Sequence, residues 1–133
     1  MENIDEVLGF LTANNPFYVA TVDGDTPRVR PFGFAMNYEG KLIFACNDQM
    51  QVYSQLKANP KFEVSTTNDC YQSIRINGKA EFITTRESKE AIVTQAPSLR
   101  RLSSEIDGIV IFYASEAEAT IWMMNGETRS FKL

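Results

Sequence analysis

Apolar residues along this chain follow two periods, one typical of helices and one typical of strands. Helical spacing appears first at the N-terminus, where four apolar residues share one face: Ile4, Val7, Leu8 and Leu11. The helices are expected over 2–13, 49–58 and 84–95, with 98–103 as one further short turn. Asn47 or Asp48 would cap the second helix, and Thr84 with Glu87 resembles a capping box at the start of the third.

Strand patterns fill the intervals between these helices, and turn residues separate them. The expected strands are 17–22, 28–37, 41–46, 61–67, 71–83 and 108–113, the last continuing through 119–124 after a bend or break near 115–118. Asn125-Gly126 is a hairpin signal, so 128–133 is expected to return as a short edge strand. A bulge is expected at Asn77-Gly78, where we infer a shift in the apolar phase of the strand.

Six or seven strands with short helices between them predict an α+β fold that is mainly β, an antiparallel six- to seven-stranded split β-barrel with short flanking helices. Tight turns join the first three strands into a meander, which argues against a Rossmann sheet because parallel neighbours need long crossovers. The chain has 133 residues and no repeat or linker, so residues 1–133 are expected to form a single domain.

Composition narrows the chemistry more than the fold. A net charge of -4 argues against nucleic-acid binding. Histidine is absent, which removes Ser-His-Asp and Cys-His nucleophiles, histidine metal sites, axial-histidine haem ligation and the usual general base near neutral pH. The two cysteines form no CxxC pair, and neither a signal peptide nor a membrane-spanning run is evident. A cytoplasmic protein with reduced thiols is therefore expected.

The segment 28–33 contains a proline and a glycine inside a predicted strand. Both break the local rules for a strand, and such breaks often mark the close approach of a ligand or of another backbone. Arg28 and Arg30 share a face and could hold a phosphate or a carboxylate. The alternative is an edge strand with solvated arginines, and the residues alone favour neither interpretation.

Three other stretches are candidates, each with a plain structural alternative. Residues 44–51 run from a strand into a helix start, which favours anions, although these residues taken alone favour an ordinary helix cap. Arg75 could pair with a carboxylate across a subunit interface or be an exposed strand arginine. Trp122 could cover a pocket or an interface, or pack in the core. The carboxylates are scattered, and we identify no catalytic acid–base pair.

Taken in order, these stretches resemble the pyridoxamine 5'-phosphate oxidase-like split barrels that bind flavin mononucleotide (FMN), especially their small, general-stress-protein-like members. The motifs that carry the resemblance are PRVRPFGF at 27–34, VYSQLKANPK at 52–61 and IRINGKA at 74–80. Their order and spacing extend over nearly the whole chain.

The resemblance implies a homodimer with two FMN sites at the subunit interface. Residues 28–31 would lie along the flavin, an arginine of this strand would approach the phosphate, and the first turn of the next helix would close the phosphate site. The partner would contribute 73–75 or the end around Trp122. The implied cofactor contacts are Arg28, Val29, Arg30, Pro31, Phe44, Ala45, Cys46, Asn47, Met50, Gln51, Ser73, Arg75 and Trp122.

Two departures from the family pattern matter. Many relatives place a lysine, often after another basic residue, where this chain has Met50 and Gln51. A neutral amide adds no charge, so weaker FMN binding or a shifted ligand is expected. The chain also lacks the C-terminal arginine–histidine motif of true pyridoxamine-phosphate oxidases, so vitamin B6 oxidation is not expected.

The sequence thus predicts an FMN-binding oxidoreductase that acts on a small molecule by hydride or electron transfer, with the flavin supplying the redox chemistry. Backbone amides of 29–31 and 45–47 could bond the pyrimidine edge of the ring, where Arg30 would favour the reduced, anionic flavin. Two alternatives stay open. One is a deazaflavin reductase using the same groove, although its acidic ligand would demand more basic residues. The other is a non-enzymatic flavin-binding or stress-sensor module, which Gln51 favours.

Overall fold

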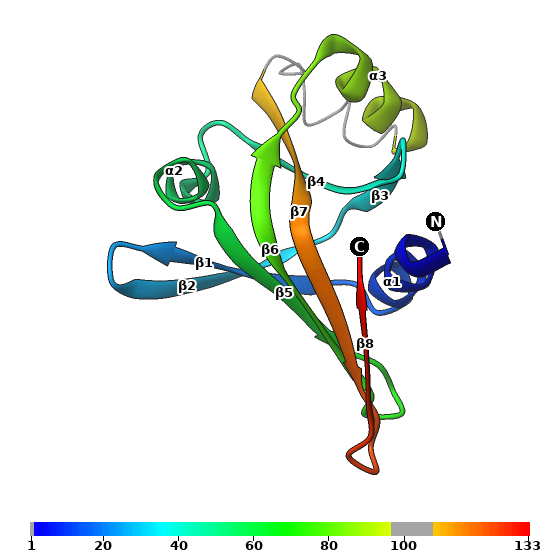
Figure 1. Ribbon diagram of the computed structural model, residues 1–133. Helices are drawn as coiled ribbons and strands as arrows, with labels where there is room; N and C mark the ends of the chain where they lie inside the picture. The colour runs from blue at the N-terminus through cyan, green and yellow to red at the C-terminus, as the bar shows by residue number, and fades with distance from the viewer. Residues whose placement is uncertain (1, 97–107) are drawn as a thin grey trace.

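The computed structural model describes residues 2–96 and 108–133. Its elements are α1 (Glu2–Ala13), β1 (Phe17–Asp23), β2 (Thr26–Phe32), β3 (Ala35–Tyr38), β4 (Lys41–Asn47), α2 (Gln51–Ala58), β5 (Lys61–Thr67), β6 (Ser73–Phe82), α3 (Arg86–Gln95), β7 (Ile109–Trp122) and β8 (Thr128–Lys132) (Figure 1). The described strands form one sheet in the order β2-β1-β5-β6-β7-β4-β3, with β8 added to β7. The predicted α+β, mainly β split barrel is confirmed, and the sheet is not closed.

The predicted strand 28–37 is two strands, which is why the sheet has eight strands rather than six or seven. β2 pairs with β1, whereas β3 pairs with β4, so the expected three-strand meander is wrong as one continuous unit. Gly33 and Phe34 lie between the two strands, and the Asn15 side-chain amide donates to the Gly33 carbonyl at 2.8 Å. β2 and β3 are the two outermost strands in the strand order, yet they follow each other directly in sequence. The two edges of the sheet therefore meet at the bend between these strands and separate on either side of it.

Both predicted helix caps are displaced by one to three residues. The residue that caps α2 is Met50, without a side-chain bond, because the Asn47 Oδ1 accepts from the Gln49 N–H at 2.7 Å instead. The residue that caps α3 is Thr85, in a reciprocal capping box with Ser88. Thr84 is unavailable as a cap because its Oγ1 accepts the Ile111 N–H at 2.9 Å. The short turn expected over 98–103 lies outside the described residues.

A bulge is confirmed where β6 pairs with β7, but its extra residue belongs to β7. The register shifts between Asn77 and Lys79, and two residues of β7, Glu116 and Ala117, stand opposite Gly78. β6 keeps its alternation through this point, so the inferred shift in its apolar phase is wrong. A Cβ on Gly78 would lie 3.1 Å from the Ala117 Cβ, which explains the glycine. β7 is continuous through the bulge.

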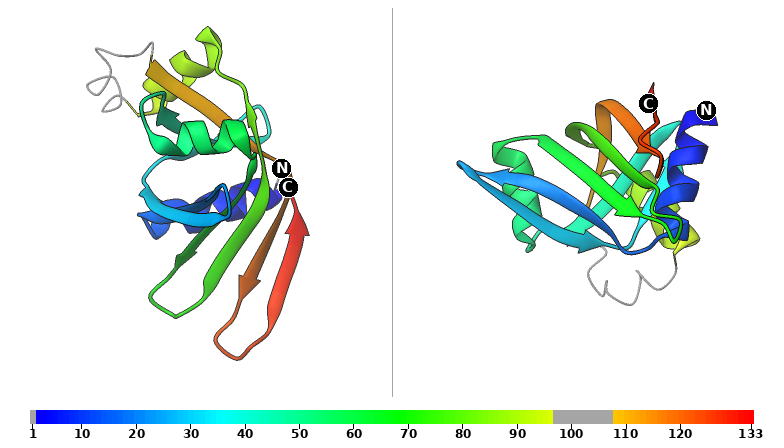
Figure 2. Two further views of the ribbon diagram at one scale, coloured as in Figure 1. Left: turned by 90° about the vertical axis from the view of Figure 1, so that its left-hand side faces the viewer. Right: turned by 90° about the horizontal axis from the view of Figure 1, so that it is seen from below.

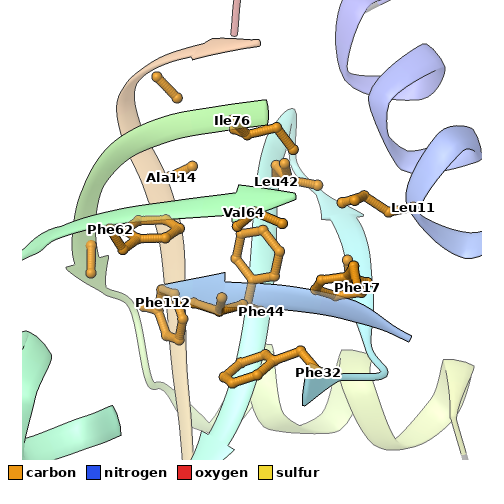
Figure 3. Packing of buried hydrophobic residues seen from close by; sticks show 14 of the residues in the cluster. Leu11, Phe17, Phe32, Leu42, Phe44, Phe62, Val64, Ile76, Phe112 and Ala114 are labelled. Atoms are coloured by element: carbon orange, nitrogen blue, oxygen red, sulfur yellow. The ribbon is translucent and has the colours of Figure 1, made fainter. Parts of the chain in front are cut away.

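Five phenylalanines from five strands fill the barrel: Phe17, Phe32, Phe44, Phe62 and Phe112 (Figure 3). The ring centroids of Phe44 and Phe62 each lie 5.5 Å from the ring centroid of Phe112. The centroids of Phe44 and Phe62 lie 5.9 Å from each other. Such contacts between aromatic rings add to the burial of their apolar area. They tie β4, β5 and β7 together across the interior of the sheet.

The helices cover different parts of this barrel. α1 packs against β3 and β4, α2 packs against β1 and β4, and α3 packs on β3 and β7 over a second, smaller apolar cluster. The β5–β6 and β7–β8 hairpins extend together away from the barrel (Figure 2). Among the described helices, none is both long and apolar enough to cross a bilayer.

Candidate functional site: a cleft at the β2–β3 bend

A cleft of about 530 Å³ lies where the sheet edges part, between the end of β2, the bend after it, β4 and the residue that precedes α2. Its lining residues are Arg30, Pro31, Phe32, Gly33, Phe34, Ala45, Met50 and Ala96. Four of these are site residues expected from the sequence: Arg30, Pro31, Ala45 and Met50. Two other hollows, of about 460 and 520 Å³, contain none of the expected site residues.

Arg30 lines this cleft, and three neutral acceptors hold its guanidinium. Its Nη1 donates to the Thr21 Oγ1 at 2.7 Å and to the Val19 carbonyl oxygen at 3.3 Å. Its Nη2 donates to the Gln55 Oε1 at 2.6 Å. The Thr21 hydroxyl also donates to the Gln55 Oε1, again at 2.6 Å, and both of these side chains are buried. Residues of β1 and α2 therefore fix the orientation of the Arg30 side chain.

No carboxylate within residues 2–96 and 108–133 forms an ion pair with Arg30. The nearby Cys46 thiol does not supply a negative charge, because burial raises its pKa to about 12. Burial lowers the pKa of Arg30, but a guanidinium stays charged at any ordinary pH. A partly buried charge without a counter-charge is unfavourable, so the part of the cleft beside Arg30 favours an anion.

The guanidinium also has unused donors that can meet such an anion. Arginine carries five N–H donors, and the contacts above use both on Nη1 and one on Nη2. The Nε–H and the second Nη2–H of Arg30 have no acceptor in the described part of the chain. A phosphate or carboxylate can accept two parallel bonds from one arginine.

Arg28 lies two residues from Arg30 on the same strand but in a different setting. Its Nε contacts the Asp23 Oδ2 at 3.3 Å, and 53% of its side chain is exposed. Arg28 does not line the cleft, and neither does Val29, which is exposed on the other face of β2. The two arginines expected to share a ligand are thus separated by their environments.

The segment 44–47 contributes to the cleft through only one side chain. Phe44 and Cys46 are buried in the core cluster, so only their backbone can reach a ligand. Ala45 alternates with them and lines the cleft. The Asn47 side chain is occupied by the turn before α2.

The start of α2 adds unpaired backbone donors beside the cleft. Met50 lines the cleft and gives the helix no side-chain cap, and its first turn contains no acidic residue. The N–H groups of Gln51 and Val52 have no acceptor among the residues that the structure describes. The Gln51 side chain is exposed. Free N–H groups at a helix start favour negative charge, in the same sense as Arg30.

The remaining expected residues lie elsewhere in this chain. Ser73 pairs with Trp122 across β6 and β7, and the Arg75 guanidinium lies 4.6 Å from the centroid of the Trp122 ring. None of the three lines the cleft. Their contribution from a partner subunit stays a prediction.

Sequence reasoning missed the two residues that hold Arg30, although each left a signal. Thr21 continues the alternation of Phe17 and Val19, so it occupies a buried position of β1. Gln55 lies between Val52 and Leu56 on the buried side of α2. A polar residue at a buried position needs a partner, and each of these two meets the other and Arg30.

The chain is similar to known proteins of one family. The family model described as pyridoxamine 5'-phosphate oxidase matches residues 4–119. A nimc/nima family protein from Clostridium acetobutylicum is 37% identical, with a TM-score of 0.93, over 99% of this chain and 93% of that one. No curated protein matches the chain.

More distant structures share the fold alone. A protein from C. acetobutylicum related to general stress protein 26 is 17% identical, with a TM-score of 0.74, over 99% of this chain and 95% of its own. A heme binding protein from Mycobacterium smegmatis is 12% identical, with a TM-score of 0.72, over 97% of this chain and 57% of its own. The family match extends from α1 to β7 and includes every side chain that lines the cleft, so the chain belongs to the pyridoxamine 5'-phosphate oxidase family.

Proposed function

We propose that this protein is an FMN-binding flavoprotein, that Arg30 binds the phosphate of the flavin, and that the protein acts as an oxidoreductase on a small molecule. The observation that carries the proposal is the Arg30 guanidinium, a partly buried cation with no carboxylate partner among the described residues, on a residue that lines an otherwise apolar cleft.

The cleft residues fit the two chemical parts of FMN. Pro31, Phe34 and Ala45 present apolar surface suited to a flat ring system. Arg30 and the uncapped start of α2 present positive charge suited to a phosphate. A ligand that is flat and apolar at one end and anionic at the other satisfies both.

Arg30 could instead meet the pyrimidine edge of the ring, as the sequence also suggested. We favour the phosphate because Met50, which precedes the uncapped helix, lines the same cleft as Arg30. Two sources of positive charge at one cleft suit a dianion better than a ring edge. The two placements differ in one consequence, since only the first makes binding depend on the phosphate.

The protein residues would bind and orient rather than transfer protons. The side chains that line the described cleft include no carboxylate, hydroxyl or imidazole. When bound, FMN supplies hydride or electron transfer. A cleft of this composition therefore suits an oxidoreductase better than a hydrolase.

We also propose that the functional form is a cytoplasmic homodimer in which the partner covers the cleft. The pair formed by the exposed Arg75 and the partly buried Trp122 is suited to this role, because an aromatic ring with a guanidinium against it offers both apolar contact and charge. Both cysteines within the described residues are free thiols, in keeping with a reducing compartment.

A deazaflavin reductase is the weaker alternative. A ligand with a long acidic tail needs several cations, and Arg30 is the single charged residue among the described residues that line the cleft. A non-enzymatic flavin carrier differs from the leading proposal only in its kinetics.

The test is the absorption spectrum of the protein as purified and after reconstitution with FMN. The proposal expects flavin bands, a higher melting temperature with FMN, and a dimer by light scattering. Stopped-flow mixing with NADH or NADPH then separates an oxidoreductase from a carrier, because only the former reduces bound flavin at a useful rate. A protein that shows neither flavin bands nor stabilisation by FMN, or a Soret band in their place, would contradict the proposal.

A further inference from the structure

The side-chain carbonyl of Gln55 is the point at which the Arg30 contacts converge. Its Oε1 accepts from the Arg30 Nη2 and from the Thr21 hydroxyl, both at 2.6 Å. The Thr21 oxygen in turn accepts from the Arg30 Nη1 at 2.7 Å. The three side chains thus form a closed triangle of hydrogen bonds, with Gln55 and Thr21 buried.

The directions of these bonds are fixed by the chemistry of the groups. Arginine only donates, so the Thr21 oxygen must accept from it and the Thr21 proton must point to Gln55. The Gln55 atom in this position must accept twice, which an amide oxygen can do and an amide nitrogen cannot. A carboxylate oxygen would satisfy the same two donors in the same place.

We propose that Gln55 is a positioning residue that holds Arg30 without neutralising it, and that it thereby makes the cleft selective for flavins with a phosphate monoester. This inference rests on the proposed function. Glutamate would fill the same volume and accept the same bonds but would pair with Arg30 as a salt bridge. The neutral amide leaves the positive charge of Arg30 for the ligand.

The charge of the ligand decides how much this matters. A phosphate monoester carries about -1.5 to -2 charges near pH 7. With glutamine, Arg30 offers it a net charge of one; with glutamate, the pair would offer none. Riboflavin has the same ring and ribityl chain without the phosphate, so its affinity should be the same with glutamine or glutamate at position 55.

The test measures dissociation constants for FMN and for riboflavin in the full-length wild type, Gln55→Glu, Gln55→Met and Ser54→Glu, by quenching of flavin fluorescence. Ser54 is exposed on the same helix, so Ser54→Glu adds the same charge outside the triangle. Circular dichroism and melting temperatures check that each variant folds.

We expect the FMN affinity of Gln55→Glu to fall by about 10- to 100-fold, the range for a charged hydrogen bond of about 1.5–3 kcal/mol, with riboflavin affinity unchanged. Gln55→Met keeps the charge of Arg30 but loosens its position, so a smaller loss and a retained preference for FMN are expected. Ser54→Glu should behave like the wild type.

Two results would overturn the inference: an undiminished preference of Gln55→Glu for FMN, or a loss in Gln55→Met as large as that in Gln55→Glu. Should Gln55→Glu fail to fold, Gln55→Met alone decides the matter, because loss of its preference for FMN contradicts a charge that persists without Gln55. A wild type that binds neither flavin, or both equally, would instead refute the proposed function. The two failures are therefore distinguishable.

Discussion

Two arginines of β2, two residues apart, lie in opposite surroundings. Arg28 is exposed and lies beside Asp23. Arg30 is partly buried among neutral acceptors. An exposed ion pair contributes about 0–1 kcal/mol and competes with water, whereas a cation in a partly buried site without a counter-charge retains its attraction for an anion. Spacing put both arginines on one face, but their neighbours decide which can hold a ligand.

The largest test of this difference is the removal of each charge in turn. Arg30→Gln should weaken FMN binding by about 10- to 100-fold, because it removes a charged contact of about 1.5–3 kcal/mol. Arg28→Gln should change the affinity by less than about twofold, since its partner is a surface carboxylate. Fluorescence titration measures both, and equal losses in the two variants would show that the contrast between Arg28 and Arg30 is functionally irrelevant.

A second change adds a positive charge at the start of α2. Gln51→Lys places a cation in the first turn of α2, beside Met50 at the cleft, and should strengthen FMN binding by about tenfold through a charged hydrogen bond. Riboflavin binding should stay the same. The same titration is used, with Lys57→Gln as a control on the same helix but in its last turn. An unchanged affinity for FMN would mean that the phosphate does not approach the start of α2.

A third change loosens the support of Arg30 without altering any charge. Thr21→Val removes one acceptor of the guanidinium and should reduce FMN affinity by about three- to tenfold, near the 1 kcal/mol expected for a neutral hydrogen bond. The smaller loss relative to Arg30→Gln follows because the charge stays. A calorimetric titration checks this, and a loss that matches Arg30→Gln would assign the main role to geometry rather than charge.

The smallest effect concerns the desolvation of the interior near Arg30, which the Cys46 thiol reports. Burial raises the pKa of Cys46 from 9.0 to about 12, with Arg30 opposing the shift. The unfolded chain then loses this proton between pH 9 and 12 while the folded chain keeps it, so the contribution of Cys46 to stability is complete below pH 9 and declines as the pH rises through that window. Urea denaturation of Cys46→Ala should show a shallower decline above pH 9 than the wild type. Equal slopes would contradict a desolvated thiol.

The strands were predictable from sequence because alternation reports one buried face, and each of the eight described strands overlaps a range predicted from the sequence. The break at Gly33 was not, since no local pattern requires that Phe32 and Ala35 pair with different strands. The break lies at the bend where the two edge strands β2 and β3 meet, and the Asn15 side chain contacts Gly33 there, across 18 positions of sequence.

The candidate site divides in the same way. Arg30, Pro31, Ala45 and Met50 were expected, and they line one cleft. The triangle that orients Arg30 joins Thr21 to Gln55 across 34 positions of sequence, a separation that periodicity cannot bridge. Arg75 and Trp122 lie outside the cleft of their own chain, because the outer face of β6 and β7 is a different surface from the bend after β2.

The most direct measurement is a crystal structure of the protein with FMN. The account predicts phosphate oxygens within hydrogen-bond distance of the Nε and Nη2 of Arg30, with the contacts of that guanidinium to Thr21 and Gln55 intact. A phosphate seated at Arg28 or on another surface, with the free edge of Arg30 facing water, would contradict it.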